Sequence, residues 1–490
     1  MDRPDLNVEV GEVENRLKVG FAGICQKDFR GDKDAEISHA VDHLGAAGKA
    51  MGFDFHPFPG RVVTGEDAAR ARKALDASGV DFLLIQSTSI GSGEALVELL
   101  KTDARVGLWA VPEPASEGAL PLNSLCGLNM NAGIMGTRPE YRDRRFKWFY
   151  GRADSRLFTR RFELTARALS ALKKIHGARI ALVGGVAPGF YDFEFDAGKV
   201  RERFGVAVEE GVRLKELFGA AEAAPEAEVE NIASQMRSAA RDVAPEAADN
   251  VERAARVEAA LRRMAERGGW SGIALRCWPE FFDQRRLSVC STVGRLNESG
   301  IAVACEGDVI SALSMMLLNH AAGDVGMLMD VSDVDLEGDA VLFWHCGPAP
   351  WSCADEEGVK LTAHSIGGRE QPDGSFERFG CVGDMVLSPG AMTVMRLTQD
   401  ADAALLVNGS FVRGKNRGFD GSRGWFTGFS FPPSGEGASA LDFVNTVMAH
   451  RFPHHFAMVR GNASGVLLEA FEWLGVDVLP LARYADHLQT

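Results

Sequence analysis

Short apolar runs alternate with amphipathic segments over the first third of the chain. A short continuous apolar run is typical of a buried strand, whereas apolar residues three and four positions apart indicate a helix that covers a sheet. The pattern predicts strands at residues 16–25, 80–86 and 106–111, and helices at residues 35–51, 66–77 and 93–100. Because strands and helices alternate, we expect a parallel sheet with helices on both faces.

The same alternation starts again in a second unit near residue 160. A helix is expected at residues 164–175 and a strand at residues 179–183, followed by a loop rich in glycine and proline at residues 184–192. The spacing of these glycines matches neither the dinucleotide-binding fingerprint nor the phosphate-binding P-loop. The loop is therefore not expected to bind a nucleotide.

After about residue 347 the helical spacing fades. Short apolar runs lie between Gly, Asn, Asp and Pro turns, which is typical of an antiparallel barrel or sandwich, and helical spacing returns only near the C-terminus. The predicted fold class is α/β, with two doubly wound parallel-sheet domains followed by a C-terminal antiparallel β-barrel. The expected domains span residues 1–160, 161–345 and 346–490, and the third ends in late helices.

The stretch Cys305-Glu306-Gly307-Asp308 stands where an apolar run ends and an apolar helical segment begins. Asp330 ends the next apolar run. Adjacent parallel strands joined by one helix lie about this far apart along a chain, so we expect Glu306 and Asp330 to project from the same edge of one sheet. Each acid could also be a helix cap or a solvated loop charge.

Two histidine positions follow, at His345 and at the pair His454-His455. Two close carboxylates repel each other unless a cation lies between them, and carboxylates with imidazoles are ligands of hard divalent metals. The set therefore predicts a metal site that also binds substrate oxygens. Strand alternation points only one of His454 and His455 inward, and His345 could instead be a satisfied core histidine.

Charge and composition narrow the classes of partner. The 490 residues carry 53 basic against 68 acidic side chains, a net charge of −15, which argues against nucleic acid or an anionic membrane as the main partner. The eight cysteines form no CxxC pair and fit reduced core thiols. The N-terminus shows no apolar signal core, so a cytoplasmic location is expected.

Taken together, these motifs resemble the L-fucose isomerase / L-arabinose isomerase superfamily, in particular its fucose isomerase-like members. The resemblance is carried by Cys305-Glu306-Gly307-Asp308 before an apolar helix, by Asp330, by Trp344-His345-Cys346-Gly347 and by His454-His455. Their order and spacing are specific as a set. The order of the predicted regions, two α/β regions followed by a barrel, also agrees with this superfamily along most of the chain.

The resemblance implies an aldose–ketose isomerase that acts on a sugar through an ene-diol with Mn²⁺ or another divalent cation such as Mg²⁺ or Co²⁺. It implies that Glu306 and Asp330 bind the metal and move protons, and that His455 completes the coordination. In arabinose-type members a histidine matched by His345 is also a ligand, whereas fucose-type members lack it. The resemblance also implies a homo-oligomer, a trimer or hexamer, in which a neighbour's N-terminal domain closes the site.

Several polar and aromatic residues are candidates for binding the substrate. Ligands meet the carboxyl ends of parallel strands, where Gln86, Asn123 and Asn131 are expected, although loop capping is the alternative for each. Arg413 belongs to an Arg-Gly-Lys-Asn-Arg cluster that either is solvated or binds an anionic group on an unusual sugar. Trp278 and Trp344 complete this set.

Two other functions use the same residues. A metal-dependent lyase or decarboxylase acting on a sugar acid needs the same stabilised ene-diolate. A non-catalytic sugar-binding protein could share the paired α/β scaffold, but it has no use for two paired carboxylates. The isomerase is the function that the residues favour.

Overall fold

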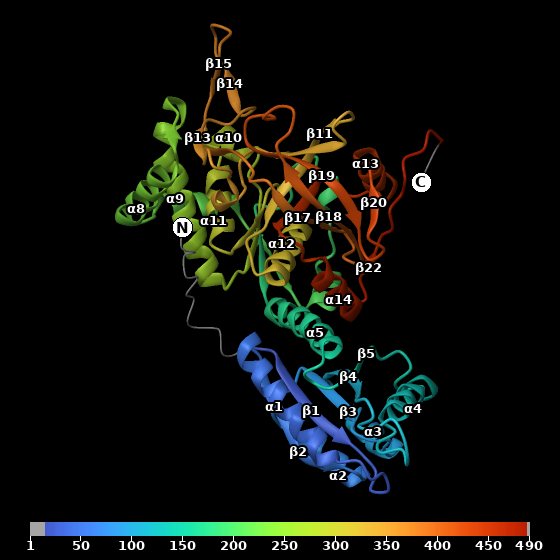
Figure 1. Ribbon diagram of the computed structural model, residues 1–490. Coiled ribbons are helices and arrows are strands. Elements are labelled where there is room, and N and C mark those ends of the chain that lie inside the picture. Colours follow the sequence, from blue (N-terminus) through green and yellow to red (C-terminus); the bar gives the residue numbers. More distant parts are fainter. Residues whose placement is uncertain (1–14, 488–490) are drawn as a thin grey trace. The chain divides into compact units, whose positions relative to one another are not determined.

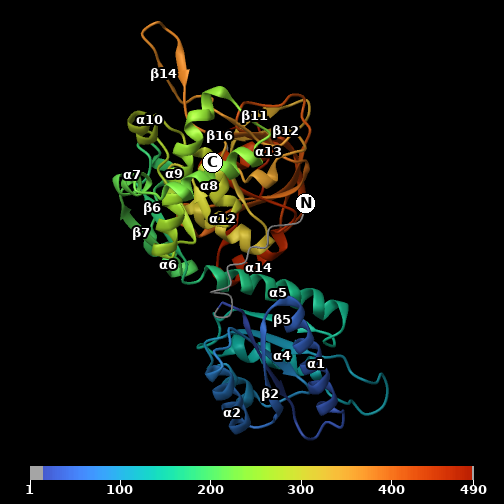
Figure 2. The same ribbon diagram turned by 90° about the vertical axis from the view of Figure 1, so that its left-hand side faces the viewer.

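The chain forms two compact units, Met1–Lys173 and Lys174–Thr490. A computed structural model describes residues 15–487, and Figures 1 and 2 show its helices and strands from two sides. Each unit has its own sheets and its own hydrophobic core. The three predicted domain ranges remain a prediction.

The first unit is built on a parallel sheet of five strands in the order β2-β1-β3-β4-β5. Its strands are β1 (Lys18–Ile24), β2 (Asp54–Val62), β3 (Phe82–Ser87), β4 (Arg105–Ala110) and β5 (Phe146–Tyr150). Its helices are α1 (Lys33–Met51), α2 (Gly65–Ala77), α3 (Gly93–Leu99), α4 (Ser124–Thr137) and α5 (Arg156–Ile175), the last of which runs into the second unit. The predicted parallel sheet is thus confirmed.

Local sequence signals set these elements. Asp32 caps the first turn of α1, and Thr64 forms a reciprocal capping box with Asp67 at the start of α2, which satisfies backbone N–H groups that the helix leaves unpaired. Trp109 on β4 is fully buried, donates to the Gly151 carbonyl at 2.8 Å and stacks on Phe158 of α5 at 4.2 Å. The indole therefore fills the core while its one polar atom stays satisfied.

The second unit begins with a parallel sheet of four strands in the order β10-β9-β6-β7. Its strands are β6 (Arg179–Val183), β7 (Ala207–Val212), β9 (Gly272–Leu275) and β10 (Ala302–Ala304). The helices of this part are η1 (Tyr191–Phe193), α6 (Ala197–Phe204), α7 (Leu214–Glu222), α8 (Glu226–Ala239), α9 (Pro245–Gly268), α10 (Glu280–Arg285), α11 (Cys290–Glu298) and α12 (Val309–Ala322). A second parallel sheet is therefore confirmed as well.

A large mixed sheet forms the rest of the second unit (Figure 1). Its strands are β8 (Asp242–Val243), β11 (Met327–Asp335), β12 (Ala340–His345), β13 (Lys360–Thr362), β16 (Val382–Val386), β17 (Gly390–Leu397), β18 (Ala403–Val412), β19 (Ser422–Phe431), β20 (Glu436–Ala438), β21 (His455–Arg460) and β22 (Asp477–Val478). A separate hairpin, β14 (Gly368–Glu370) and β15 (Phe376–Arg378), projects from this part, and η2 (Trp351–Cys353), α13 (Ala440–Ala449) and α14 (Ser464–Leu474) complete it.

The mixed sheet differs from the predicted C-terminal barrel. Because β18 pairs with β19 as well as β17, the strands β18, β17, β21, β11, β12 and β19 pair in a ring. Two of them, β11 and β12, lie before residue 346, and the sheet also contains parallel pairs. A distinct barrel beginning at residue 346 is therefore not confirmed.

The predicted position of Asp330 at the end of a parallel strand is wrong. Asp330 lies within β11, which runs antiparallel to both β12 and β21. The apolar run before it looked like a strand of the same sheet as β10 because periodicity reports burial and not strand partners.

Among the described helices, none combines the length and the apolar character needed to cross a bilayer.

A buried carboxylate ties α9 to α11 in the second unit. The side chain of Glu258 on α9 is completely buried, and its oxygens lie 2.9 Å from Arg262 and 2.7 Å from Arg295 of α11. Both carboxylate oxygens are thus paired. Removing one member of a buried ion pair leaves the other charges desolvated without compensation.

Glu258→Ala is expected to lower the free energy of unfolding of the second unit by about 2–4 kcal/mol, since Arg262 and Arg295 lose their shared partner. Urea unfolding followed by circular dichroism measures this loss. The control is Glu226→Ala, which removes an exposed partner of Arg256 and is expected to cost less than about 1 kcal/mol. Equal losses in the two variants would contradict the assignment of α9 and α11 to one buried network.

Candidate active site

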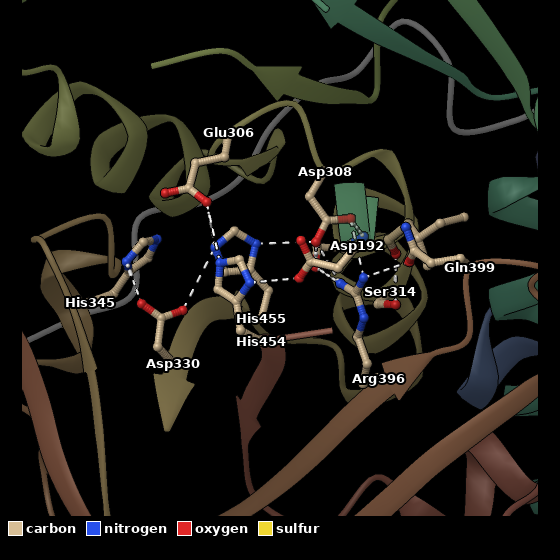
Figure 3. Close-up of polar contacts among 12 residues, drawn as sticks. Asp192, Glu306, Asp308, Ser314, Asp330, His345, Arg396, Gln399, His454 and His455 are labelled. Carbon is tan, nitrogen blue, oxygen red and sulfur yellow. Dashed lines mark hydrogen bonds and ion pairs between the residues drawn. The ribbon is translucent and has the colours of Figure 1, made fainter. Parts of the chain in front are cut away.

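A cavity of about 750 Å³ opens in the second unit. It lies within the size range of small-molecule sites, roughly 300–1,000 Å³. Five of the predicted site residues line it: Trp278, Glu306, Asp330, Trp344 and His345. Figure 3 shows the acidic and imidazole side chains of this region turned toward one another.

Glu306 stands at a sharp turn between β10 and α12. Its backbone has φ +62°, in the left-handed region that side chains resist, and Gly307 follows at φ +80°. A Cβ on Gly307 would overlap the Gly185 carbonyl, so only glycine fits there. The Glu306 carbonyl accepts a hydrogen bond of 2.8 Å from the Ala187 N–H. The glycine-rich loop after β6 therefore holds the turn that presents Glu306, rather than a phosphate.

Asp330 and His455 are direct partners across the antiparallel pair of β11 and β21. Opposite residues on one sheet face point the same way, so the register alone places the two side chains together. His455 Nε2 lies 3.7 Å from Asp330 Oδ1 and 3.6 Å from Glu306 Oε2. Three of the four residues that were predicted to bind a metal thus converge, and Figure 3 shows them with the fourth, His345, beside Asp330.

His345, at the end of β12, is buried beside Asp330. Its Nδ1 lies 3.1 Å from Asp330 Oδ2, a hydrogen-bond distance. Burial lowers the pKa of His345, but the Asp330 and Cys346 charges outweigh it and raise that pKa well above the ordinary value. Burial raises the pKa of Asp330, and His345 outweighs it in turn, so that the pKa of Asp330 is lowered. In this arrangement His345 is a hydrogen-bond partner that keeps Asp330 ionised.

Asp308 holds His455 from the side opposite Glu306. It is the N-cap of α12 and is completely buried, with Oδ1 accepting from the Ser311 N–H at 2.9 Å. Oδ2 lies 2.6 Å from Arg396 of β17 and 3.1 Å from His455 Nδ1. Burial raises the pKa of Asp308, but Arg396 and His455 outweigh it and hold that pKa well below its usual range.

The Asp308 carboxylate fixes the tautomer of His455. An ionised carboxylate only accepts hydrogen bonds, so Nδ1 carries the hydrogen and donates it to Asp308. The lone pair of Nε2 then faces Glu306 and Asp330. Metal-binding histidines are held in this way by a carboxylate on the opposite ring nitrogen.

His454 also reaches Glu306, although only one of the two adjacent histidines was expected to point inward. Its Nε2 lies 3.3 Å from Glu306 Oε2 and its Nδ1 lies 2.8 Å from Asp192 Oδ2. The side chain is 40% exposed, whereas that of His455 is completely buried. Burial lowers the pKa of His454, and its contacts with Glu306 and the nearby Asp330 charge outweigh that and raise it.

Unpaired buried atoms mark the centre of the site. Within residues 15–487, Asp330 Oδ1, His345 Nε2 and His455 Nε2 are buried and have no hydrogen-bond partner. Such atoms are costly unless a ligand satisfies them. Ligand atoms 2.0–2.1 Å from an octahedral ion lie about 3 Å from one another. His455 Nε2 lies slightly farther than this from its neighbours, 3.6 Å from Glu306 Oε2 and 3.7 Å from Asp330 Oδ1. The residues present therefore fit a divalent cation held by oxygen and imidazole nitrogen.

The first unit contains the other predicted polar residues. Gln86 at the end of β3 accepts from Thr88 at 2.8 Å, and Asn131 on α4 donates to Ser87 at 3.1 Å. Both are buried. Asn123 occupies the N-cap position of α4 but makes no capping hydrogen bond with its side chain. These contacts hold the loops after β3 and β4, and their role in binding a substrate remains a prediction.

Arg413 is not brought to the site. Its side chain is 73% exposed and pairs with Glu356, and it does not line the cavity. The neighbouring basic residues are paired as well, Lys415 with Asp335 and Arg417 with Glu357. Of the two alternatives for this cluster, the structure agrees with a solvated surface cluster, because each basic side chain pairs with a carboxylate.

Comparisons with known proteins agree with a sugar-converting site. No family profile matches the chain. A sulfoquinovose isomerase from Alkalicoccus urumqiensis is 31% identical over 346 residues, which cover 69% of this chain and 75% of that protein. A sulfoquinovose isomerase from Priestia aryabhattai is 26% identical over 429 residues, which cover 86% of this chain and 90% of that protein.

The chain belongs to the sulfoquinovose isomerase family. It is accordingly an enzyme, an aldose–ketose isomerase and thus an intramolecular oxidoreductase. Membership of the wider L-fucose / L-arabinose isomerase superfamily remains a prediction. Among solved structures, an ABC transporter solute-binding protein from Mycobacterium smegmatis is 14% identical, covers 63% of this chain and 90% of that chain, and has a TM-score of 0.16, too low to support any argument.

Sequence reasoning missed the supporting residues of this sulfoquinovose isomerase-family site. Asp308 belongs to the Cys305-Glu306-Gly307-Asp308 stretch, but the sequence indicated only a helix cap for it, and it is indeed the N-cap of α12. Arg396 gave no signal, because an arginine inside an apolar run is ambiguous until its partner is known. Asp192 lay in the loop whose glycine spacing was tested only for nucleotide binding.

If the predicted metal site binds Mn²⁺, Asp308→Asn is expected to weaken the affinity by about 10–100-fold, because a neutral amide holds the Nδ1–H tautomer of His455 less firmly than a carboxylate does. Isothermal titration calorimetry of the metal-free protein with Mn²⁺ measures the affinity.

Asp384→Asn is a matched control for Asp308→Asn. Asp384 lies on β16 and pairs with the buried Arg423, so this variant also disturbs a buried ion pair but leaves His455 untouched. It is expected to lose stability without losing Mn²⁺ affinity. Equal weakening in both variants would show that Asp308 acts only through the fold.

Proposed function

We propose that the protein converts an aldose carrying a sulfonate group, sulfoquinovose, into the corresponding ketose through an ene-diol, with Glu306, Asp330 and His455 at the centre. The observation that carries the proposal is the convergence of these side chains at a cavity lined by Glu306 and Asp330, where the buried Asp330 Oδ1 and His455 Nε2 have no hydrogen-bond partner among the described residues. The substrate is suggested by the names of the relatives. An isomerisation of this kind needs no nicotinamide or flavin.

Glu306 is the proton carrier in this proposal. The reaction removes a proton from carbon 2 of the aldose and returns one to carbon 1, which requires a base that can be protonated and deprotonated in turn. Glu306 Oε2 contacts His454, which contacts Asp192, and both of these side chains are about 40% exposed. This chain of groups connects Glu306 to solvent and lets it reset its protonation state.

Asp330 has a different part. Its hydrogen bond with His345 keeps the carboxylate ionised, as the lowered pKa reflects. A carboxylate that stays ionised is a poor proton carrier, but it stabilises a nearby positive charge well. Asp330 therefore serves as a fixed negative charge beside the reacting carbons, while Glu306 moves the proton.

Glu306, Asp330 and His455 would hold the divalent cation, Mn²⁺ or alternatively Mg²⁺ or Co²⁺. When bound, such a cation supplies Lewis acidity, which stabilises negative charge that develops on the substrate oxygens. His455 is already oriented for this by Asp308. Trp278 and Trp344 line the same cavity and offer apolar ring faces to the C–H groups of a sugar. A homo-oligomer also remains part of the proposal.

A lyase or decarboxylase and a non-catalytic sugar-binding protein are the competing functions. The protein is incubated with Mn²⁺ and sulfoquinovose in D₂O, and the products are followed by NMR. We expect a ketose with the same number of carbons and deuterium at carbon 1. A shortened carbon chain would identify a lyase, and an unchanged, undeuterated sugar would identify a protein that only binds.

Glu306→Gln is expected to lower kcat by about 10²–10⁴-fold, because glutamine cannot accept the carbon-bound proton. The fold is expected to persist, since glutamine has nearly the same volume. Turnover of sulfoquinovose and the circular dichroism spectrum are measured together. Glu337→Gln, an exposed acid in the turn after β11, is the control and should remain fully active. Full activity of the Glu306 variant would rule out its role.

Removal of metal is expected to abolish turnover, because the buried donors then repel one another and the Lewis acid is lost. Dialysis against EDTA followed by addition of Mn²⁺, Mg²⁺ or Co²⁺ tests this, with the metal content measured by mass spectrometry. Activity should return with the added cation. Undiminished turnover in metal-free protein would overturn the metal part of the proposal.

A further inference from the structure

We infer that Arg286, Arg369 and Ser288 form the subsite that recognises the anionic end of the substrate, a sulfonate; this inference rests on the proposed function. All three residues line the same cavity as Glu306 and Asp330. None of them belongs to the cluster of carboxylates and imidazoles. The two arginines add permanent positive charge to the cavity lining, and all three residues offer hydrogen-bond donors.

A continuous wall of rings leads from the carboxylate cluster to the arginines. Cys346 follows His345 in the chain and lies beside His364. The His364 ring is 5.1 Å from that of Phe282, and Phe282 is 5.8 Å from Phe379. The Arg286 guanidinium lies 6.0 Å from the centre of the Phe379 ring. These side chains thus connect the carboxylate cluster at Asp330 and His345 with the arginines in another part of the same cavity.

Arg286 and Arg369 bring two guanidinium groups to this part of the cavity lining, which also includes the acid Asp283. Arg286 follows α10 and pairs with Glu377 of β15. Arg369 on β14 lies directly opposite Glu377 in the hairpin, and across residues 15–487 it makes no ion pair. Two guanidinium groups therefore flank one carboxylate. Each guanidinium has five N–H donors, so Arg286 keeps donors free beside its bond with Glu377.

Ser288 is the independent sign that a ligand belongs here. Its side chain is almost completely buried, and its Oγ has no hydrogen-bond partner among the described residues. It lies two residues after Arg286, in the segment between α10 and α11, and lines the cavity. A buried hydroxyl without a partner is unfavourable in an empty site and is satisfied by an oxygen atom of a ligand.

The donors match the chemistry of a sulfonate. A sulfonate is ionised at every physiological pH and presents three acceptor oxygens, which suit guanidinium forks and a hydroxyl donor. A phosphate ester shares these properties, whereas a neutral sugar does not. A hexose whose carbonyl end lies at Glu306 and Asp330 extends its far end along the wall, where the arginines lie.

The test compares two sugars that differ only in this group: sulfoquinovose, and quinovose, which has a methyl group in place of the sulfonate-bearing carbon. Arg286→Met and Arg369→Met are each expected to lower kcat/KM for sulfoquinovose by about 10–100-fold. Ser288→Ala is expected to lower it less, by about 3–10-fold. For quinovose, all three variants are expected to stay within about threefold of the wild type, because the methyl group makes no charged contact.

Arg285→Met and Arg413→Met are the matched controls. Arg285 precedes Arg286 in the chain but pairs with Glu222 and lies over Phe218, away from the cavity lining. Arg413 is the exposed arginine that the sequence had named as a candidate for binding an anionic group. Both variants are expected to keep the wild-type ratio of the two kcat/KM values. A loss with either control as large as with Arg286→Met would assign the effect to overall charge and overturn the subsite.

The outcomes separate this inference from the proposed function. Wild-type turnover of sulfoquinovose that Arg286→Met and Arg369→Met leave unchanged would overturn the subsite but keep the function. Equal losses on both sugars would also overturn it, because the arginines would then act on the fold or on catalysis. Wild-type protein that prefers quinovose, or converts neither sugar, would overturn the proposed substrate and the subsite together. A selective loss on sulfoquinovose, restored in part by Arg286→Lys, supports both.

Discussion

The ion pair between Asp308 and Arg396 is the interaction on which the active site depends. Both side chains are completely buried, and breaking such a pair costs about 3–5 kcal/mol because the remaining charge has no solvent. The same carboxylate caps α12 and accepts from His455. The Asp308 carboxylate therefore connects α12, Arg396 on β17 of the mixed sheet and the imidazole of His455.

The site lies where two kinds of sheet meet, and each contributes in its own way. The parallel sheet ends at β10 and presents Glu306 on a left-handed turn that the Gly184-Gly185 loop supports. The mixed sheet supplies Asp330 and His455 as opposed residues of β11 and β21. A rigid ladder fixes one pair of groups, while a supported turn fixes the third. This arrangement suits a site that must hold charge and also move a proton.

Electrostatics divides the cavity into regions with different tasks. Near Asp330, carboxylates and imidazoles perturb one another's pKa values, as is common where protons move. His454 contacts both Glu306 and Asp192, and the side chains of His454 and Asp192 are partly exposed to solvent. Farther along the wall, the cavity lining includes Arg286 and Arg369 together with Asp283. In the proposed subsite, the two guanidinium groups would bind the anionic end of the substrate while its carbonyl end lies at the carboxylates.

The sequence by itself determined the layered class of the fold and the acidic and histidine residues that lie together in it. Apolar runs separated by helical segments predicted both parallel sheets, and the acids at positions 306 and 330 with the histidines at 345 and 454–455 predicted the groups that converge. Only the tertiary structure decided which strands pair. It places Asp330 in the mixed sheet and not in the predicted parallel sheet, and it does not confirm a separate barrel that begins at residue 346. It also decided which charges matter: Arg413 is solvated, whereas Arg396 is buried. Burial patterns are local, but partners along a β-ladder and across a buried ion pair are chosen by the whole chain.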